Sequence, residues 1–176
     1  MNDTDRQRLN DAIRDVPDFP KPGVVFKDIT PVLGDGELFR LAVDGLIGLA
    51  GGAQIDKIVG IDARGFIFGA AAAYQLGIGF VPVRKKGKLP WTTHGAAYSL
   101  EYGEAEIEVH KDAIHEGERV FLIDDLLATG GTAGAAVELL GQLGCELLGL
   151  AFLIELKFLN GREKLGDAPV GALLQY

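Results

Sequence analysis

One stretch of the sequence indicates the fold, VFLIDDLLATGGT at residues 120–132. It opens with a short apolar run, Val120 to Ile123, which is typical of a strand buried in a sheet. Two adjacent carboxylates, Asp124 and Asp125, follow, and small residues then lead into a segment with helical spacing from about 132 to 143. Because the first amides of a helix have no partners inside it, this turn between strand and helix is suited to bind an anion.

Strands and helices also alternate along most of the remaining chain. Apolar residues recur at helical spacing or in short continuous runs, and glycines close several of the helices. The pattern predicts helices at about 38–50 and 65–76, and strands at 57–61, 80–83 and 147–154. Pro82 places its strand near an edge or at a strand end. Strands joined by helices at this spacing predict an α/β fold with a mostly parallel, twisted sheet flanked by helices.

The pattern changes between Arg84 and Gly117. Residues 105–110 alternate apolar and polar side chains, as an antiparallel strand with one exposed face does, and residues 98–102 are a candidate partner across a turn at Gly103. We therefore expect an inserted β-hairpin that acts as a lid, from about residue 89 to 104. No break in composition separates a second domain, and 176 residues suit one domain at roughly 150 residues each.

Composition and charge disfavour several classes of protein. With 17 basic and 25 acidic residues the formal net charge is −8, which disfavours non-specific electrostatic binding to nucleic acid or anionic lipid. The longest apolar runs fall far below the ~18 residues of a membrane span, and residues 1–10 lack the apolar stretch of a secretory signal. One cysteine and three histidines show no zinc-site spacing. We expect a cytoplasmic protein that binds neither nucleic acid nor membranes.

The first candidate site is the turn that follows the 120–123 strand. The amides of residues 128–132, with the hydroxyls of Thr129 and Thr132, are suited to enclose one phosphate monoester. Asp124 and Asp125 are then placed to bind sugar hydroxyls or to help hold a divalent cation. The alternative is a tight turn with an ordinary helix cap. A Walker A loop is excluded because the lysine is missing, and the chain has no GxGxxG motif.

Two further segments are expected at the same sheet edge, where ligands of open parallel sheets bind. RKKGK at 84–88 places four cations in five residues and suits a more highly charged phosphate group; the alternative is a solvated loop. GIDARGF at 60–66 joins a strand to a helix, and its amides and Arg64 suit another anion; the alternative is a surface residue at a helix start. Two phosphate sites separated by carboxylates imply a ribose phosphorylated at both ends.

Residues 120–132 closely resemble the phosphoribosyl pyrophosphate (PRPP) signature of the type I phosphoribosyltransferases. That signature alone indicates only the superfamily. The chain is also similar, in order and over nearly its whole length, to the adenine phosphoribosyltransferases, at FPKPGVVFKDITP (19–31), ARGF (63–66), GKLP (87–90) and YSLEYG (98–103). LNGREKL (159–165) also resembles this family, but we assign it no chemistry.

The resemblance implies a purine salvage enzyme that transfers the 5-phosphoribosyl group from PRPP to N9 of adenine, giving AMP and pyrophosphate. It implies a 5′-phosphate site at Ala128, Thr129, Gly130, Gly131 and Thr132, and ribose contacts at Asp124 and Asp125. It places pyrophosphate at Asp62, Ala63, Arg64, Arg84, Lys85 and Lys88, with the peptide bond Asp62–Ala63 expected to be cis.

For the base, the resemblance implies a small N-terminal hood at about 1–35. There Val25 and Lys27 recognise adenine through main-chain atoms and Phe26 covers the ring. The position of Lys27 is commonly arginine in this family. Glu101, in the lid, approaches the imidazole side of the purine as acid or base. Without the resemblance, the sequence would indicate that Phe26 is a core aromatic residue and that Glu101 is a solvated residue in a turn.

These roles suit the chemistry of the reaction. Breaking the anomeric bond leaves a cationic, oxocarbenium-like sugar and a departing pyrophosphate, so catalysis needs cations and Mg²⁺ on the leaving group and carboxylates around the sugar. The resemblance implies that PRPP itself holds most of the Mg²⁺ coordination, and that the chain forms a homodimer. A closing lid excludes water.

Two other functions remain open from the sequence. One is a phosphoribosyltransferase for another base, such as hypoxanthine, guanine or xanthine, since all share the phosphate sites. The other is a PRPP-sensing regulator of transcription, which needs a basic nucleic-acid-binding element for which this acidic chain has no room.

Overall fold

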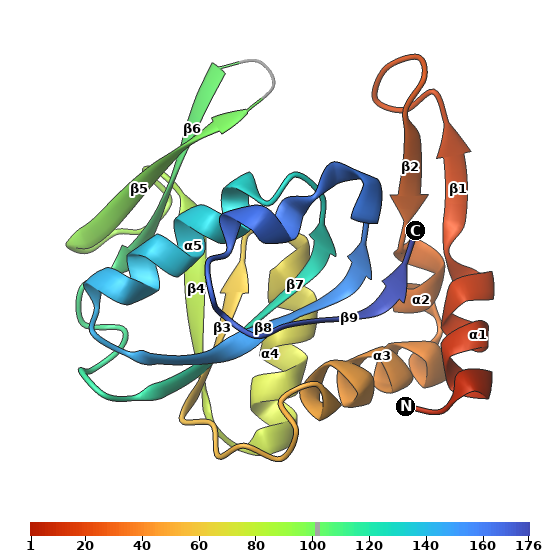
Figure 1. Cartoon of the computed structure of the whole chain (residues 1–176). Coiled ribbons are helices and arrows are strands. Elements are labelled where there is room, and N and C mark those ends of the chain that lie inside the picture. The colour runs from red at the N-terminus through yellow and green to blue at the C-terminus, as the bar shows by residue number, and fades with distance from the viewer. Residues whose placement is uncertain (101–102) are drawn as a thin grey trace.

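The computed structural model describes residues 1–100 and 103–176, with the backbone alone at 99, 100, 103 and 104. Within these ranges one sheet has the strand order β5-β6-β4-β3-β7-β8-β9 (Figure 1). Its strands are β3 (Lys57–Ile61), β4 (Gly79–Lys85), β5 (Thr93–Leu100), β6 (Gly103–His110), β7 (Arg119–Leu127), β8 (Glu146–Glu155) and β9 (Val170–Gln175). Neighbours from β4 to β9 are parallel, whereas β5 and β6 are antiparallel. The expected α/β fold with a mostly parallel sheet is confirmed.

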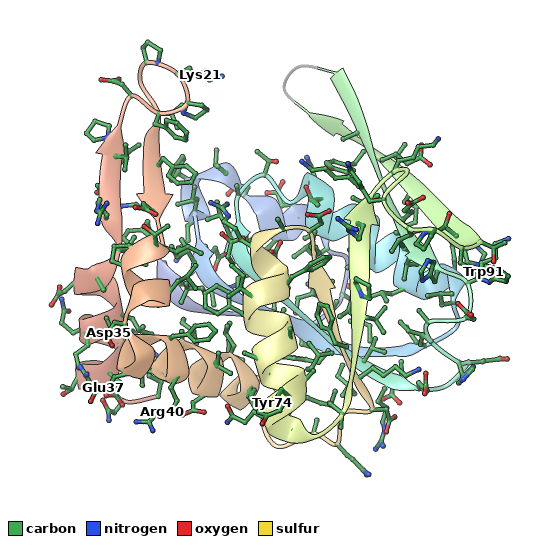
Figure 2. All side chains as sticks on the ribbon, turned by 180° about the vertical axis from the view of Figure 1, so that it is seen from behind. Lys21, Asp35, Glu37, Arg40, Tyr74 and Trp91 are labelled. Atoms are coloured by element: carbon green, nitrogen blue, oxygen red, sulfur yellow. The ribbon has the colours of Figure 1, made fainter. Side chains whose placement is uncertain are left out.

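Helices cover both faces of this sheet. Helices α3 (Gly36–Gly48) and α4 (Arg64–Leu76) lie on one face and α5 (Gly131–Gln142) on the other (Figures 1 and 2). Along β7, Val120 and Leu122 belong to the apolar cluster of α5, whereas Phe121 and Ile123 belong to that of α3 and α4. Burial on both faces is why the strands read as continuous apolar runs. In the described ranges, no helix is both long and apolar enough to cross a membrane.

The N-terminal residues form a small unit beside the main sheet. It contains α1 (Asp3–Ala12), β1 (Arg14–Pro17), β2 (Val25–Asp28) and α2 (Thr30–Gly34), and β1 pairs with β2 in an antiparallel two-stranded sheet. The hydroxyl of Tyr176 donates to Oδ1 of Asn10 at 2.9 Å, which joins α1 to the end of the chain. Figure 1 shows β1–β2 and the β5–β6 hairpin rising beyond opposite ends of the carboxyl edge of the main sheet.

Most predicted elements have the expected position. The β3 strand matches the prediction at both ends, and the helix bounds differ by at most two residues. The prediction that β7 ends before its carboxylates is wrong, because β8 continues to pair with β7 as far as Leu127. The sequence pattern predicted no helices or strands inside the expected N-terminal hood. It also did not predict β9 or the 3₁₀ turns Lys157–Leu159 and Gly161–Lys164, since short segments carry little periodicity.

The inserted hairpin is confirmed, although Gly103, where the turn was expected, is instead the first residue of β6 and pairs with Leu100. The pairing of the hairpin with β4 explains Pro82. Strand β6 pairs with β4 only at Arg84 and Lys85, so β4 has no neighbouring strand beside Pro82 on that side. A residue without an amide hydrogen is therefore tolerated inside the strand order. Whether the hairpin closes as a lid stays a prediction.

Candidate active site

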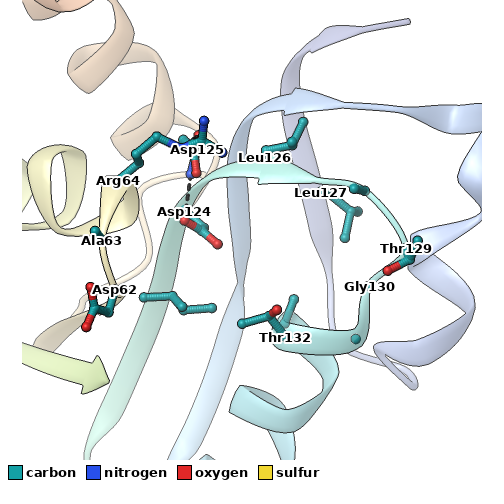
Figure 3. A pocket seen from close by; sticks show the side chains of 14 residues that line it. Asp62, Ala63, Arg64, Asp124, Asp125, Leu126, Leu127, Thr129, Gly130 and Thr132 are labelled. Carbon is teal, nitrogen blue, oxygen red and sulfur yellow. Dashed lines mark hydrogen bonds and ion pairs between the residues drawn. The ribbon is translucent and has the colours of Figure 1, made fainter. Parts of the chain in front are cut away.

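A pocket of about 350 Å³ opens at the carboxyl edge of the sheet (Figure 3). Two of the three predicted segments line it: residues 61–64, where β3 meets α4, and residues 124–133, where β7 meets α5. Because β3 and β7 are parallel neighbours, both segments emerge at the same edge. The volume lies in the range of roughly 300–1,000 Å³ typical of small-molecule sites.

The turn before α5 leaves its backbone amides available to a ligand. Gly130 occupies the N-cap position with φ 75°, and this turn has no side-chain cap. Thr129 and Thr132 lie on the same turn (Figure 3). A Cβ at Gly130 would collide with the carbonyl oxygen of Gly161, so both space and backbone angle require glycine here. The ordinary side-chain cap considered from the sequence is therefore not what this described turn contains.

The two carboxylates beside this turn have different partners. Arg64 Nε lies 2.7 Å from Oδ2 of Asp125, and the Asp125 amide donates to Oδ1 of Asp124 at 2.9 Å (Figure 3). Burial raises the pKa of Asp124, and the neighbouring charge of Asp125 raises it further. Burial also raises the pKa of Asp125, although Arg64 opposes this. Hydrogen bonds from hydroxyl groups, or a nearby cation, would therefore stabilise the ionised form of these carboxylates.

The third predicted segment adjoins the pocket through Asp62. Arg84 Nε lies 3.3 Å from Oδ2 of Asp62, and the Asp62 amide donates to the carbonyl of Val83 at 2.9 Å. The peptide bond Asp62–Ala63 is cis, as expected. Lys85 and Lys88 are exposed on the turn that follows Arg84. The cationic turn does not line the pocket itself, but it lies at the same sheet edge.

Of the expected base-binding residues on β2, Phe26 lies next to the pocket residue Arg64. The guanidinium carbon of Arg64 lies 5.3 Å from the ring centre of Phe26, while Val25 is exposed. The side chain of Lys27 points elsewhere: Nζ lies 2.6 Å from Oδ1 of Asp15 and 3.8 Å from the ring centre of Tyr176. Strand β2 pairs only with β1 in its two-stranded sheet. Among residues 1–100 and 103–176, no strand pairs with the main-chain groups on the other edge of β2.

The predicted acid or base, Glu101, lies outside the described residues. The described part of the predicted lid consists of the connection from β4, in which Trp91 is 67% exposed, of β5 and of the start of β6 (Figure 2).

Four apolar residues of the pocket lining, Ile61, Leu126, Leu127 and Ala133, were given no site role from the sequence. Ala133 lies in the first turn of α5. The other three are on strands. They continue the apolar runs of β3 and β7, and nothing in those runs marks the point where the pocket begins. Gly161, which backs Gly130, lies in a segment similar to the family, but no sequence pattern links the two glycines.

Comparison with known proteins agrees with this geometry. Residues 42–167 match the family described as the phosphoribosyl transferase domain. An adenine phosphoribosyltransferase of Anaeromyxobacter dehalogenans is 58% identical over 164 residues, covering 93% of this chain and 95% of that protein. The chain belongs to the adenine phosphoribosyltransferase family. The resemblance seen in the sequence is thereby confirmed.

Solved adenine phosphoribosyltransferases share the whole fold. The enzyme of Rhodothermus marinus has a TM-score of 0.94 and 53% identity, covering 99% of this chain and 100% of that one. The enzyme of Saccharomyces cerevisiae, in complex with D-2,5-dideoxy-2,5-imino-altritol 1,6-bisphosphate and adenine, has a TM-score of 0.92 and 44% identity, covering 97% and 99%. The activity expected from the resemblance, phosphoribosyl transfer to adenine, is that of this family of glycosyltransferases.

Proposed function

We propose that this chain transfers the 5-phosphoribosyl group from PRPP to N9 of adenine in the pocket at the carboxyl edge, giving AMP and pyrophosphate. The observation that carries the proposal is the meeting, at one sheet edge, of an uncapped helix start, two carboxylates and a cationic turn. This arrangement suits a sugar phosphorylated at both ends. The structure of the yeast relative, which contains a bisphosphorylated imino sugar and adenine, supports the same interpretation of the pocket.

The 5′-phosphate end of PRPP occupies the turn at Ala128, Thr129, Gly130, Gly131 and Thr132. Its charge is met by the amides at the start of α5 and by the positive end of the helix dipole. Asp124 and Asp125 accept hydrogen bonds from the ribose hydroxyls. The negative charge of Asp125, which the neighbouring Arg64 favours, also stabilises the cationic sugar that forms as the anomeric bond breaks.

The pyrophosphate end of PRPP faces the cations of Arg64, Arg84, Lys85 and Lys88, together with Asp62 and Ala63. Arg84 is held by Asp62, and its Nη1 donates to the carbonyl of Lys88 at 3.1 Å, so this side chain is preorganised. Arg64 pairs with Asp125, next to the ribose position. A departing pyrophosphate gains charge as it leaves, and fixed cations stabilise that charge.

Adenine binds between the N-terminal hood and the pocket. Phe26 covers the ring, and main-chain groups of Val25 and Lys27 on the free edge of β2 recognise the base. The engagement of the Lys27 side chain with Asp15 and Tyr176 supports main-chain recognition, since its ammonium is already used. The replacement of the family's usual arginine by lysine then matters little to the base.

The segment at about 89–104, which contains β5 and the first residues of β6, acts as the lid. Glu101 acts as the acid or base at the imidazole side of the purine. Closure excludes water from the oxocarbenium-like sugar, which water would otherwise capture.

Mg²⁺ is the expected cofactor. The carboxylate oxygens of Asp124 and Asp125 are hard donors that suit this ion, and the described residues contain no cluster of three ligating side chains that would hold it alone. The donor set fits an ion coordinated mainly by PRPP phosphates, with these two aspartates nearby. When bound, Mg²⁺ neutralises charge on the leaving pyrophosphate.

A homodimer is the expected assembly. Ile67 and Tyr74, which are seven residues apart and therefore on the same face of α4, are 41% and 90% exposed and support it, because a pair of apolar side chains on one face can be covered by a second copy (Figure 2 labels Tyr74). Analytical ultracentrifugation measures the mass directly, and a monomer at micromolar concentration would contradict it. The cytoplasmic location stays a prediction.

Activity with a panel of purines tests the function. The purified chain, with PRPP and Mg²⁺, is expected to convert adenine to AMP and to leave hypoxanthine, guanine and xanthine largely unused. Turnover of a 6-oxopurine but not of adenine would favour the other phosphoribosyltransferases. Tight, salt-sensitive retention of DNA or RNA on a filter would favour the regulator.

A further inference from the structure

A buried carboxylate, Glu108, lies directly beneath the cationic turn. It is on β6, paired with Arg84 of β4 on one side and with Gly95 of β5 on the other, and it is 7% exposed. Two other buried acidic residues, Asp125 and Glu155, each pair with an arginine. Within the described residues, Glu108 has no ion pair, so its partners are of another kind.

Those partners are main-chain amides of the turn. Oε1 of Glu108 accepts from the amides of Lys88 at 3.1 Å and Leu89 at 3.0 Å, and Oε2 accepts from the hydroxyl of Thr93 at 3.2 Å. Burial raises the pKa of Glu108, but the hydrogen bonds of Leu89, Thr93 and Lys88 outweigh it and leave the pKa below its usual value. The group is therefore an anion near neutral pH.

The turn held by this carboxylate also has supports nearer its start, where the Lys86 amide donates to the carbonyl of Glu106 at 3.0 Å and Lys86 Nζ lies 2.6 Å from Oε2 of Glu106. Further along, Gly87 has φ 77°, the Lys88 amide also donates to the carbonyl of Lys85 at 3.2 Å, and Arg84 Nη1 donates to the carbonyl of Lys88.

Removing Glu108 leaves the Leu89 amide without its carboxylate acceptor and the Lys88 amide with the carbonyl of Lys85, at a part-buried place, which favours rearrangement of the turn. Arg84 and Lys88 would then lose their relative placement.

The sign of the charge separates two explanations of Glu108. A negative charge beneath an anion site weakens the attraction between that site and pyrophosphate. The charge of Glu108 therefore opposes the binding of PRPP, whereas its hydrogen bonds to the amides of the turn can aid binding by fixing the position of the cations.

We propose that Glu108 is a positioning residue of the leaving-group site, which fixes the 84–89 turn so that its cations face the pyrophosphate of PRPP. The inference rests on the pyrophosphate assignment proposed above. It concerns a residue that is expected to touch neither substrate.

The test compares E108Q and E108A in the full-length chain. Dissociation constants for PRPP, pyrophosphate and AMP are measured by calorimetry, with the melting temperature followed in parallel. We expect E108A to weaken PRPP and pyrophosphate about tenfold and E108Q about threefold, because Gln keeps one acceptor oxygen, while AMP changes less than about twofold. AMP has no pyrophosphate group, so a change confined to the pyrophosphate site spares the affinity for AMP. A general loss of structure would weaken the affinity for AMP as well.

The matched control is D56N. Asp56 lies before β3, at the other end of the sheet, and it likewise accepts a main-chain amide, that of Arg119, at 2.9 Å. D56N is expected to lower the melting temperature without changing the affinity for PRPP.

Three outcomes would overturn the inference: PRPP binding unchanged in both Glu108 variants, tighter PRPP binding in E108Q as a purely electrostatic role predicts, or equal losses for AMP and PRPP. R84A in the same assay shows whether the pyrophosphate assignment or only the role of Glu108 is wrong. If R84A leaves PRPP affinity intact, the pyrophosphate assignment is wrong and the inference falls with it. If R84A weakens PRPP but the Glu108 variants do not, only the role of Glu108 is wrong.

Discussion

Replacement of Gly130 by alanine tests the phosphate turn most directly. Gly130 has φ 75°, and this left-handed conformation costs an alanine roughly 1–2 kcal/mol. The added Cβ would also collide with the carbonyl oxygen of Gly161, which is backbone and cannot turn aside. The turn must therefore shift, and the amides at the start of α5 shift with it.

The expected loss of binding follows from that displacement. A hydrogen bond to a charged group contributes roughly 1.5–3 kcal/mol, so displacing the amides that meet the 5′-phosphate is expected to weaken the affinity of G130A for AMP and PRPP by at least about tenfold each. Both ligands are affected alike because both contain the 5′-phosphate. G161A, whose Cβ would collide with the carbonyl oxygen of Ala128, is expected to act in the same direction.

Gly77 provides the matched control. It has φ 69° at the end of α4, and a Cβ there would meet nothing within 4 Å. G77A is therefore expected to lower the free energy of unfolding by about 1 kcal/mol while leaving AMP affinity unchanged. Calorimetric titration with AMP and urea unfolding measure the two effects. If G130A binds AMP as the unmodified chain does, or if G77A weakens AMP equally, the phosphate assignment is refuted.

R84A is expected to weaken PRPP and pyrophosphate about tenfold and to spare AMP; an equal loss for AMP in calorimetry would contradict the leaving-group assignment. E101Q should lower kcat by about a hundredfold with little change in PRPP affinity, and steady-state kinetics showing equal losses would indicate a structural role. K27M should change the KM for adenine by less than about threefold, because the base contacts its main chain; a tenfold increase would show that the side chain orients the base. Hydrogen bonds from Arg119 lower the pKa of Asp56 from 3.8 to about 2, so this group stabilises the fold above pH 3.8 and less as the pH falls towards 2. The difference in melting temperature between the unmodified chain and D56N should therefore shrink on acidification, and a constant difference would count against that ion pair.

The sequence predicts much of this site because its signals are local. A strand followed by carboxylates, small residues and a helix is recognised within residues 120–143, and parallel pairing sends such turns to one edge. The prediction failed on the end of β7, which depends on how far β8 accompanies it. It also missed Gly161 and the pocket lining at Leu126, where nothing local distinguishes these residues from their neighbours.

By itself, the sequence determined the alternation of strands and helices, the two turns that we propose to bind phosphate groups, and the family, since periodicity and turn chemistry depend on adjacent residues. Only the tertiary structure decided that Asp125 pairs with Arg64, that Lys27 lies against Tyr176, and that Glu108 supports the cationic turn. These contacts join residues far apart along the chain. They arise from strand order, register and burial, and hydrophobic periodicity specifies which face of a strand is covered but not which distant side chain meets it there.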